Sequence, residues 1–238
     1  VKNLGPYTFL ESGTVSGQGQ SDQESQRIMP GQPLGTFFGP VFAGVDAQGH
    51  QQFRCTSATA GCTNGLTTDG FGPDAADYAI IGNANPDWTM GLTSQLTKGK
   101  FNFSFLIRAA VGLNVFNNTA LVYSTKSNAL QDKNFLKEAL TDPTGLHEPA
   151  IFSSRWVENA SFVRLQNVTL EYNLDLPVLT RNARSARVYV SGDNLLTMTG
   201  YSGLDPEVYA TAGLASRGVE YLSYPRPRLI TGGVRLAF

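Results

Sequence analysis

Short stretches of this chain alternate apolar and polar side chains residue by residue. Six of them have the length of β-strands: 35–45, 89–97, 101–111, 162–174, 186–195 and 229–238. In 101–111, Phe101, Phe103, Phe105, Ile107, Ala109 and Val111 share one strand face, and Asn102, Ser104 and Arg108 share the other. Most of the stretches have the roughly 9–11 residues that cross a bilayer at a tilt. The pattern predicts an all-β, antiparallel fold with lipid on one face and water on the other.

The connections between these stretches alternate in length. A tight turn, Lys98-Gly99-Lys100, follows 89–97, and a long loop to residue 161 follows 101–111. A shorter link follows 162–174, and a second long loop runs to residue 228. Outer-membrane barrels have short periplasmic turns and long extracellular loops. We therefore expect a section of an antiparallel transmembrane β-barrel, with 46–88 among the extracellular loops and the terminal Phe238 on the periplasmic side.

Two further features refine the barrel prediction. In 162–174, Val163 and Leu165 are out of step with Val168, Leu170 and Tyr172, which predicts a β-bulge. Six strands cannot close a barrel, since single-chain outer-membrane barrels begin at about eight strands. We expect upstream strands of a longer protein to complete the ring, because the chain starts without a methionine or an export signal.

The remaining segments show less regular patterns. Residues 1–34 are rich in Gln, Ser and Gly and are predicted to be a connecting segment at the periplasmic side, before a barrel section over 35–238. Within the long loop, Phe135, Leu136 and Leu140 recur at helical spacing and predict a short helical patch near 131–140.

Composition and charge exclude several other classes of protein. With 18 Lys and Arg against 19 Asp and Glu, the chain offers no basic surface for nucleic acid. His50 and His147 lie in loops away from any recognisable nucleophile motif, so we expect neither an enzyme nor a cofactor. Cys55 and Cys62 form a close pair in a loop of small residues, which favours a local disulfide over free thiols.

Several side chains are candidates for ligand contact. Asp69, Asp74 and Asp77 could hold Ca²⁺ through their carboxylates, but their spacing matches no EF-hand loop, and turn-forming, solvated Asp residues are the favoured interpretation. Trp88 and Trp156 suit an aromatic girdle at the membrane interface or, for Trp156, packing within a loop. Alternatively, Trp156 or Tyr201 could stack on a sugar ring.

Charged residues bracket the last long loop. Asp205 and Glu207 lie near its start, and Arg226 and Arg228 lie at its end. A salt bridge between loop and wall is one interpretation, and contact of the arginines with anionic ligands in the lumen is another.

Five stretches, in order along the chain, carry a resemblance to a known family. They are 31–46, 77–96, 159–174, 186–208 and 224–238, and together they resemble the C-terminal part of SusC/RagA-type TonB-dependent outer-membrane proteins. The final strand with its terminal aromatic residue is also similar to the signal read by barrel-assembly machinery. The resemblance extends nearly from end to end of the chain.

The resemblance implies a fold, a function and partners. It implies about six C-terminal strands of a barrel of about 22 strands, with a plug supplied by the rest of the protein. It also implies uptake of glycan or peptide fragments, driven by the TonB complex and assisted by a SusD-like lipoprotein. No stretch here matches a plug or a TonB-contacting segment.

Two alternatives remain on sequence grounds. A secreted, soluble β-sandwich that binds glycan would show the same alternation, with a core on one strand face and water on the other. A small oligomeric pore, in which several copies share one barrel, would give a multimer that is stable in detergent.

Overall fold

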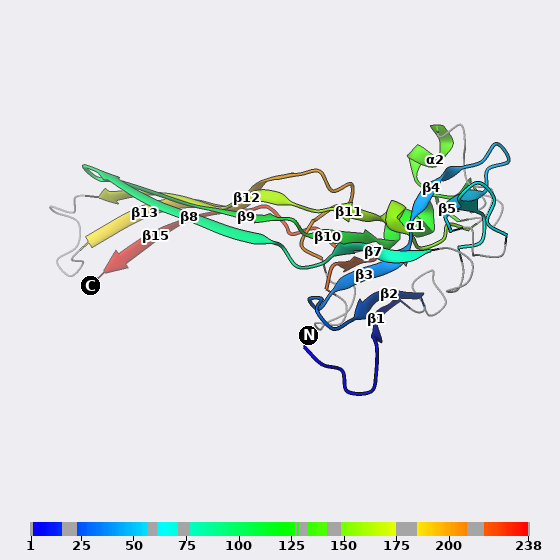
Figure 1. The fold of residues 1–238 in the computed structure, drawn as a ribbon. Helices are drawn as coiled ribbons and strands as arrows, with labels where there is room; N and C mark the ends of the chain where they lie inside the picture. The colour runs from blue at the N-terminus through cyan, green and yellow to red at the C-terminus, as the bar shows by residue number, and fades with distance from the viewer. Residues whose placement is uncertain are drawn as a thin grey trace. The chain divides into compact units, whose positions relative to one another are not determined.

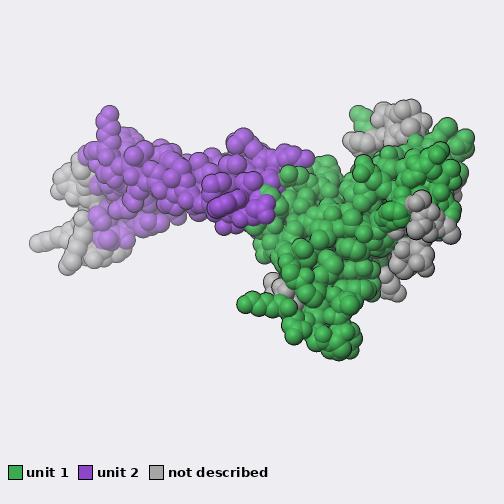
Figure 2. Space-filling model, viewed as in Figure 1, with its two compact units in different colours: residues 1–86, 112–160, 201–224 green, residues 87–111, 161–200, 225–238 purple. Residues whose placement is uncertain are grey.

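The computed structural model describes residues 2–15, 23–56, 61–70, 77–126, 128, 133–141, 149–174, 185–208 and 217–237. The chain divides into two compact units, each assembled from three segments of the sequence (Figure 2). Unit 1 comprises residues 1–86, 112–160 and 201–224, and unit 2 comprises residues 87–111, 161–200 and 225–238. Within the described ranges, no helix is long and apolar enough to span a membrane.

Unit 2 is a single five-stranded sheet in the order β15-β13-β12-β9-β8 (Figure 1). Its strands are β8 (Trp88–Lys98), β9 (Phe101–Val111), β12 (Phe162–Leu174), β13 (Ser185–Thr199) and β15 (Leu229–Ala237). All neighbours are antiparallel. The turn between β8 and β9 contains Gly99 at φ 59°, a left-handed conformation that glycine adopts without strain. Five of the six predicted strands therefore form one sheet, and 101–111 and 162–174 have the predicted bounds.

The register of this sheet places both long connections at one end. Residues 112–160 follow the end of β9, and residues 201–224 follow β13, whose ends are aligned with the start of β12. The tight turn at Gly99 and the end of β15 lie at the opposite end. This is the predicted alternation of short and long connections.

The described residues of unit 1 form three smaller sheets. The first has the order β1-β2-β3-β7, with β1 (Leu10–Val15), β2 (Gln23–Ile28), β3 (Thr36–Pro40) and β7 (Tyr78–Asn83). The second joins β4 (Phe42–Val45), β5 (Gln51–Arg54) and β6 (Leu66–Thr67). The third has the order β11-β10-β14, with β10 (Asn114–Asn117), β11 (Val157–Asn159) and β14 (Val219–Glu220). Short helical elements accompany them, among them α1 (Asn118–Tyr123), α2 (Lys137–Thr141) and the 3₁₀ turn η2 (Ser154–Trp156).

The core of unit 1 draws on all three of its segments. Its buried members are Val15, Phe37, Ala84, Phe116, Leu121, Phe152, Trp156 and Val219. The rings of Phe116 and Phe152 meet edge to face with centroids 4.7 Å apart. The long connections thus fold together with the first 86 residues around one core.

Two predicted elements differ in the structure. The stretch 35–45 is two short strands, because β3 and β4 join different sheets. Pro40 still pairs with Tyr78 of β7, whereas the Val41 carbonyl accepts from the Arg54 N–H of β5 at 2.9 Å. The predicted helical patch is limited to α2 among the residues described there, while Phe135 and Leu136 precede it.

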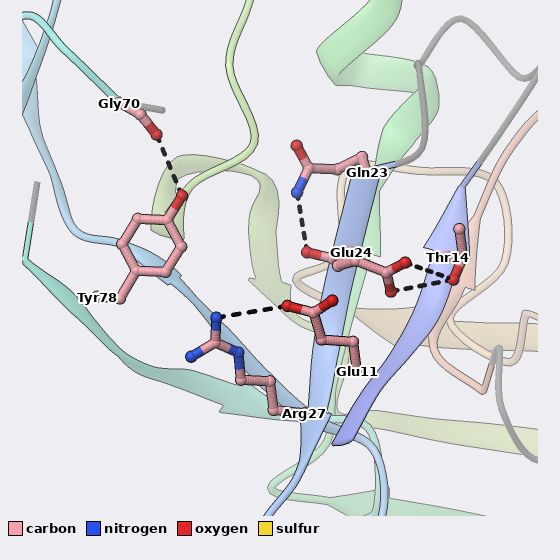
Figure 3. A network of polar contacts seen from close by, with 7 residues as sticks. All are labelled: Glu11, Thr14, Gln23, Glu24, Arg27, Gly70 and Tyr78. Atoms are coloured by element: carbon pink, nitrogen blue, oxygen red, sulfur yellow. Dashed lines mark hydrogen bonds and ion pairs between the residues drawn. The ribbon is translucent and has the colours of Figure 1, made fainter. Parts of the chain in front are cut away.

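Residues within 1–34 include two paired strands. β1 and β2 pair as a hairpin, with Thr14 donating to the Glu24 carboxylate at 2.9 Å and Arg27 facing Glu11 at 3.7 Å (Figure 3). The Arg27 guanidinium also lies over the ring of Phe38, 4.4 Å from its centroid. These contacts join the hairpin to β3, so both sides of the predicted boundary at 34/35 belong to unit 1.

Candidate functional site

One face of the unit 2 sheet carries large apolar side chains that no described part of the unit covers. Register places Met90, Ala109, Val163 and Met198 side by side across four strands. Members of this face with relative exposures between 38% and 75% are Trp88, Met90, Leu92, Leu96, Phe101, Val111, Val163, Leu170, Leu174, Val190, Leu196, Met198, Ile230, Val234 and Leu236. A contiguous apolar surface of this kind is typical of contact with a membrane or another protein. We call it the apolar face.

The bulge in β12 keeps that face continuous. Pairing with β9 and with β13 shifts between Leu165 and Asn167, which leaves Gln166 as the inserted residue. Without it, Val168 and Leu170 would turn to the opposite side of the sheet, because strand side chains alternate. The bulge predicted from the phase slip is confirmed.

The opposite face, which we call the polar face, carries hydroxyl, amide and charged groups. One row runs across all five strands and contains Gln95, Ser104, Thr169, Ser191 and Thr231. Asn167 donates a hydrogen bond to Asp193 at 2.8 Å in the neighbouring row. A sheet that is apolar on one side and polar on the other matches a barrel wall between lipid and an aqueous lumen.

One cluster of charges on the polar face is centred on Glu171. Its carboxylate accepts from Arg187 at 2.8 Å and from Arg235 at 3.2 Å. The Arg235 guanidinium also lies 5.1 Å from the ring centroid of Tyr189. One carboxylate therefore bridges arginines from β13 and β15 across three adjacent strands.

A second polar cluster lies in unit 1 around the buried ring of Tyr201. Burial raises the pKa of the Tyr201 hydroxyl, and the negative charges of Glu220, Glu158 and Asp205 raise it further. The Glu158 carboxylate accepts from the side-chain amide of Asn117 at 2.9 Å and from the Ser202 hydroxyl at 2.7 Å. These bonds hold the loop that starts at Tyr201 against β10 and β11.

Glu220 holds the other end of the same loop. Its carboxylate accepts from the Thr119 hydroxyl at 3.0 Å and from the Ser223 backbone N–H at 2.9 Å. Thr119 Oγ1 in turn accepts from the Leu222 N–H at 2.7 Å. The Glu158 and Glu220 carboxylates thus link the two long connections through hydrogen bonds, and the donors of these bonds are other groups of this chain.

The predicted ligand-facing residues fall in different places. Tyr201 and Asp205 are both buried in the cluster just described, and the Glu207 N–H donates to Asp205 at 2.9 Å. Trp156 lies in the unit 1 core at 6% exposure and donates from Nε1 to the Ile151 carbonyl. Contact of its ring with a sugar stays a prediction. Trp88, in contrast, is 72% exposed at the start of β8.

The predicted loop charges are divided between the units. Asp205 and Glu207 belong to unit 1, whereas Arg226 and Arg228 belong to unit 2 and are exposed. A salt bridge between them, and their contact with a ligand, stay predictions.

The structure joins Cys55 and Cys62 in a disulfide, as their spacing favours. Asp74 lies outside the described residues, so the calcium candidate is only partly visible. Of its other members, Asp77 accepts from Thr56 Oγ1 at 3.4 Å, and the Asp69 N–H donates to Thr67 Oγ1 at 3.1 Å. The described part of the chain contains no group of three His, Cys, Asp or Glu residues suited to a metal ion.

The sequence analysis did not identify the linking roles of Glu158 and Glu220. The sequence does mark Asn117, the residue that donates to Glu158. Asn117 caps α1 by accepting from the Ala120 N–H at 2.9 Å, and an Asn before a helical run is a recognisable N-cap. Nothing in the local sequence marks Glu220, because its partner Thr119 is far away along the chain.

Comparison with known proteins gives a consistent picture. No family model matches the chain. It is 32% identical to TonB-dependent receptor P3 of Formosa agariphila over 91% of this chain and 23% of the receptor. It is 30% identical to TonB-dependent receptor SusC of Bacteroides thetaiotaomicron over 69% of this chain and 16% of SusC.

Solved structures agree with these relatives on the fold. The chain resembles a chain of the RagAB peptide importer in its "closed-closed" state with a TM-score of 0.73 and 23% identity, covering 99% of this chain and 25% of that one. The "open-open" state gives a TM-score of 0.72 at 24% identity, over 96% and 24% of the two chains. The chain thus spans a quarter or less of the length of the proteins it matches.

Proposed function

The chain belongs to the SusC/RagA-type TonB-dependent receptors of the bacterial outer membrane, and we propose that it forms wall and outer loops of a nutrient importer. In this role unit 2 is a section of the barrel wall, and unit 1 is part of the body that faces the surroundings of the cell. The imported cargo is a short oligomer such as a peptide or an oligosaccharide.

The two-faced sheet of unit 2 carries this proposal. Its exposed apolar side chains suit lipid, and the complete polar row from Gln95 to Thr231 suits a water-filled lumen. β12 has 13 residues, which at roughly 3.3 Å each and a tilt of about 45° traverse about 30 Å, the thickness of the hydrocarbon core. A soluble sandwich is not favoured, since it would cover the apolar face with a second sheet.

We propose a different position for the first 34 residues. β1 and β2 belong to the same unit as the long connections that leave one end of the wall. We therefore place 1–34 with the outer loops, in contrast to the periplasmic position predicted from the sequence.

The proposed partners follow from the family. Upstream residues supply the remaining strands and a plug, a SusD-like lipoprotein covers the outer side, and the TonB complex supplies energy. The relatives are receptors and transporters, and we infer that this chain makes or breaks no covalent bond in its cargo.

Uptake by cells tests the proposal. The full-length receptor that contains this chain is expressed in a host lacking its own homologue, and entry of fluorescent oligopeptides and oligosaccharides is measured with and without TonB. We expect uptake that requires both the receptor and TonB. If cells that lack the receptor or TonB took up the probes as well as cells that have both, the transport function would be contradicted.

A further inference from the structure

Most charged side chains on the polar face of unit 2 are arginines in directly opposed pairs. Arg108 is the register partner of Arg164, and Arg187 is the register partner of Arg235. Like charges directly opposite each other on neighbouring strands destabilise a sheet. The only carboxylates among the described residues of this face are Glu171 and Asp193. The face therefore has an excess of positive charge.

The pair nearer the end of β15 is accessible. Arg187 and Arg235 side chains are 41% and 64% exposed, whereas Glu171 between them is 16% exposed. A single carboxylate shared by two guanidinium groups leaves one net positive charge. Each guanidinium carries five N–H donors in a planar fork, which matches carboxylate and sulfate groups, and its bond to Glu171 uses one nitrogen.

The other pair lies toward the opposite end of the same face. Arg164 is buried beside the ring of Phe162, and Arg108 donates to Gln166 at 3.4 Å. Along β12, Arg164 is separated from Asn173, the register partner of Arg187, by nine residues or about 30 Å. Arginine pairs thus occur near both ends of the wall section.

We propose that this polar face selects anionic cargo, with Arg187 and Arg235 as an exposed contact point for carboxylate or sulfate groups of the passing oligomer. The inference rests on the proposed import function and deepens it by naming the charge of the cargo. The anionic groups could belong to an acidic peptide or to an acidic oligosaccharide, which share the chemistry that guanidinium forks recognise.

Binding to the purified full-length receptor tests the selection. The probes are a Gly/Glu peptide against the same peptide with Gln in place of Glu, and an oligogalacturonate against a neutral glucose oligomer of equal length. Dissociation constants are measured for the wild type, for Arg187→Gln with Arg235→Gln, and for Glu171→Gln. The matched control is Lys98→Gln with Lys100→Gln, which removes two cations from the turn at the same end of the sheet.

We expect at least one acidic probe to bind more tightly than its neutral counterpart. The double arginine variant should weaken acidic binding about tenfold or more, the typical effect of losing charge-assisted hydrogen bonds, and should leave neutral binding unchanged. Glu171→Gln should strengthen acidic binding, and the lysine control should match the wild type. The pair of probes that responds identifies the source as peptide or oligosaccharide.

Equal binding of acidic and neutral probes, absence of binding, or an unchanged preference in the double arginine variant would overturn the inference. If that variant instead lowers the melting temperature without changing probe binding, the arginines contact another part of the receptor. TonB-dependent uptake of neutral probes alone would uphold import but refute anionic selection. Binding of acidic probes without uptake would uphold anionic selection but refute import.

Discussion

A charged residue at the centre of the apolar face should impair assembly far more than the same residue one position along. Val168 is the seventh of the 13 residues of β12, so it lies at the middle of the strand, with Phe105 and Gly192 as register partners on the apolar face. Thr169 follows it on the polar face, between Ser104 and Ser191. Val168→Arg therefore places an arginine toward lipid, and Thr169→Arg places one toward the lumen, at the same depth in the membrane.

The size of the difference follows from the position. Either end of β12 is six residues from Val168, or about 14 Å along the membrane normal at a tilt of about 45°. At this depth an arginine on the lipid face costs about 2–4 kcal/mol, which corresponds to a factor of about 30 to 700 in the folding equilibrium. Thr169→Arg reaches water in the lumen and should cost less than about 1 kcal/mol.

The assay is the heat-modifiable gel mobility of the full-length receptor from outer membranes, which reports the folded fraction and its melting temperature. Val168→Phe is the control, because lipid accommodates a larger apolar side chain but a packed protein core resists it. Equal behaviour of the two arginine variants, or greater damage from Thr169→Arg, would refute the assignment of faces. Failure of Val168→Phe together with Val168→Arg would favour a buried core.

Three further predictions concern unit 1. Gly218 has φ 72°, and an added Cβ would lie 2.6 Å from the Ala84 side chain, so Gly218→Ala should lower the free energy of unfolding by about 1–3 kcal/mol. Gly91→Ala, with open space around the glycine, is the control and should be neutral in thermal unfolding. Equal melting temperatures of the two variants would contradict this prediction. Replacing Cys55 and Cys62 by Ser opens a small loop and should destabilise the region of β5 and β6 by about 2 kcal/mol, seen as faster proteolysis there, and an unchanged cleavage rate would argue against the disulfide. Because folding raises the pKa of Tyr201, the stability that the neutral hydroxyl contributes is fully present below the unfolded pKa of about 10 and is lost as pH rises above that value. Tyr201→Phe should therefore weaken the dependence of the melting temperature on pH in that range. Melting temperatures of the variant and the wild type that fall in parallel with pH would refute the reasoning.

The wall could be predicted from the sequence because its determinants are local. Alternation and the phase slip at Gln166 depend on neighbours within one strand, and lipid on one side and water on the other make the pattern strict. The same reasoning extended 35–45 into one strand, since periodicity does not reveal that β3 and β4 bond to different neighbours.

Unit 1 could not be predicted in the same way. Its hydrogen bonds join residues such as Thr119 and Glu220 that are distant in the sequence. Short strands such as β14 gain their stability from tertiary packing. The sequence shows charged groups at both ends of the last loop, but the burial of Tyr201 and Asp205 depends on tertiary packing.

The shared core of unit 1 has a consequence for how such receptors can change. Val15, Phe116 and Val219 come from three separate segments yet pack in one cluster, and Glu158 and Glu220 bind the two long connections to each other. A single connection transplanted from a relative would arrive without its packing partners. Diversification by recombination should therefore exchange these segments as a set, and an antibody or phage that recognises this body should depend on its folded shape more than on any one linear peptide.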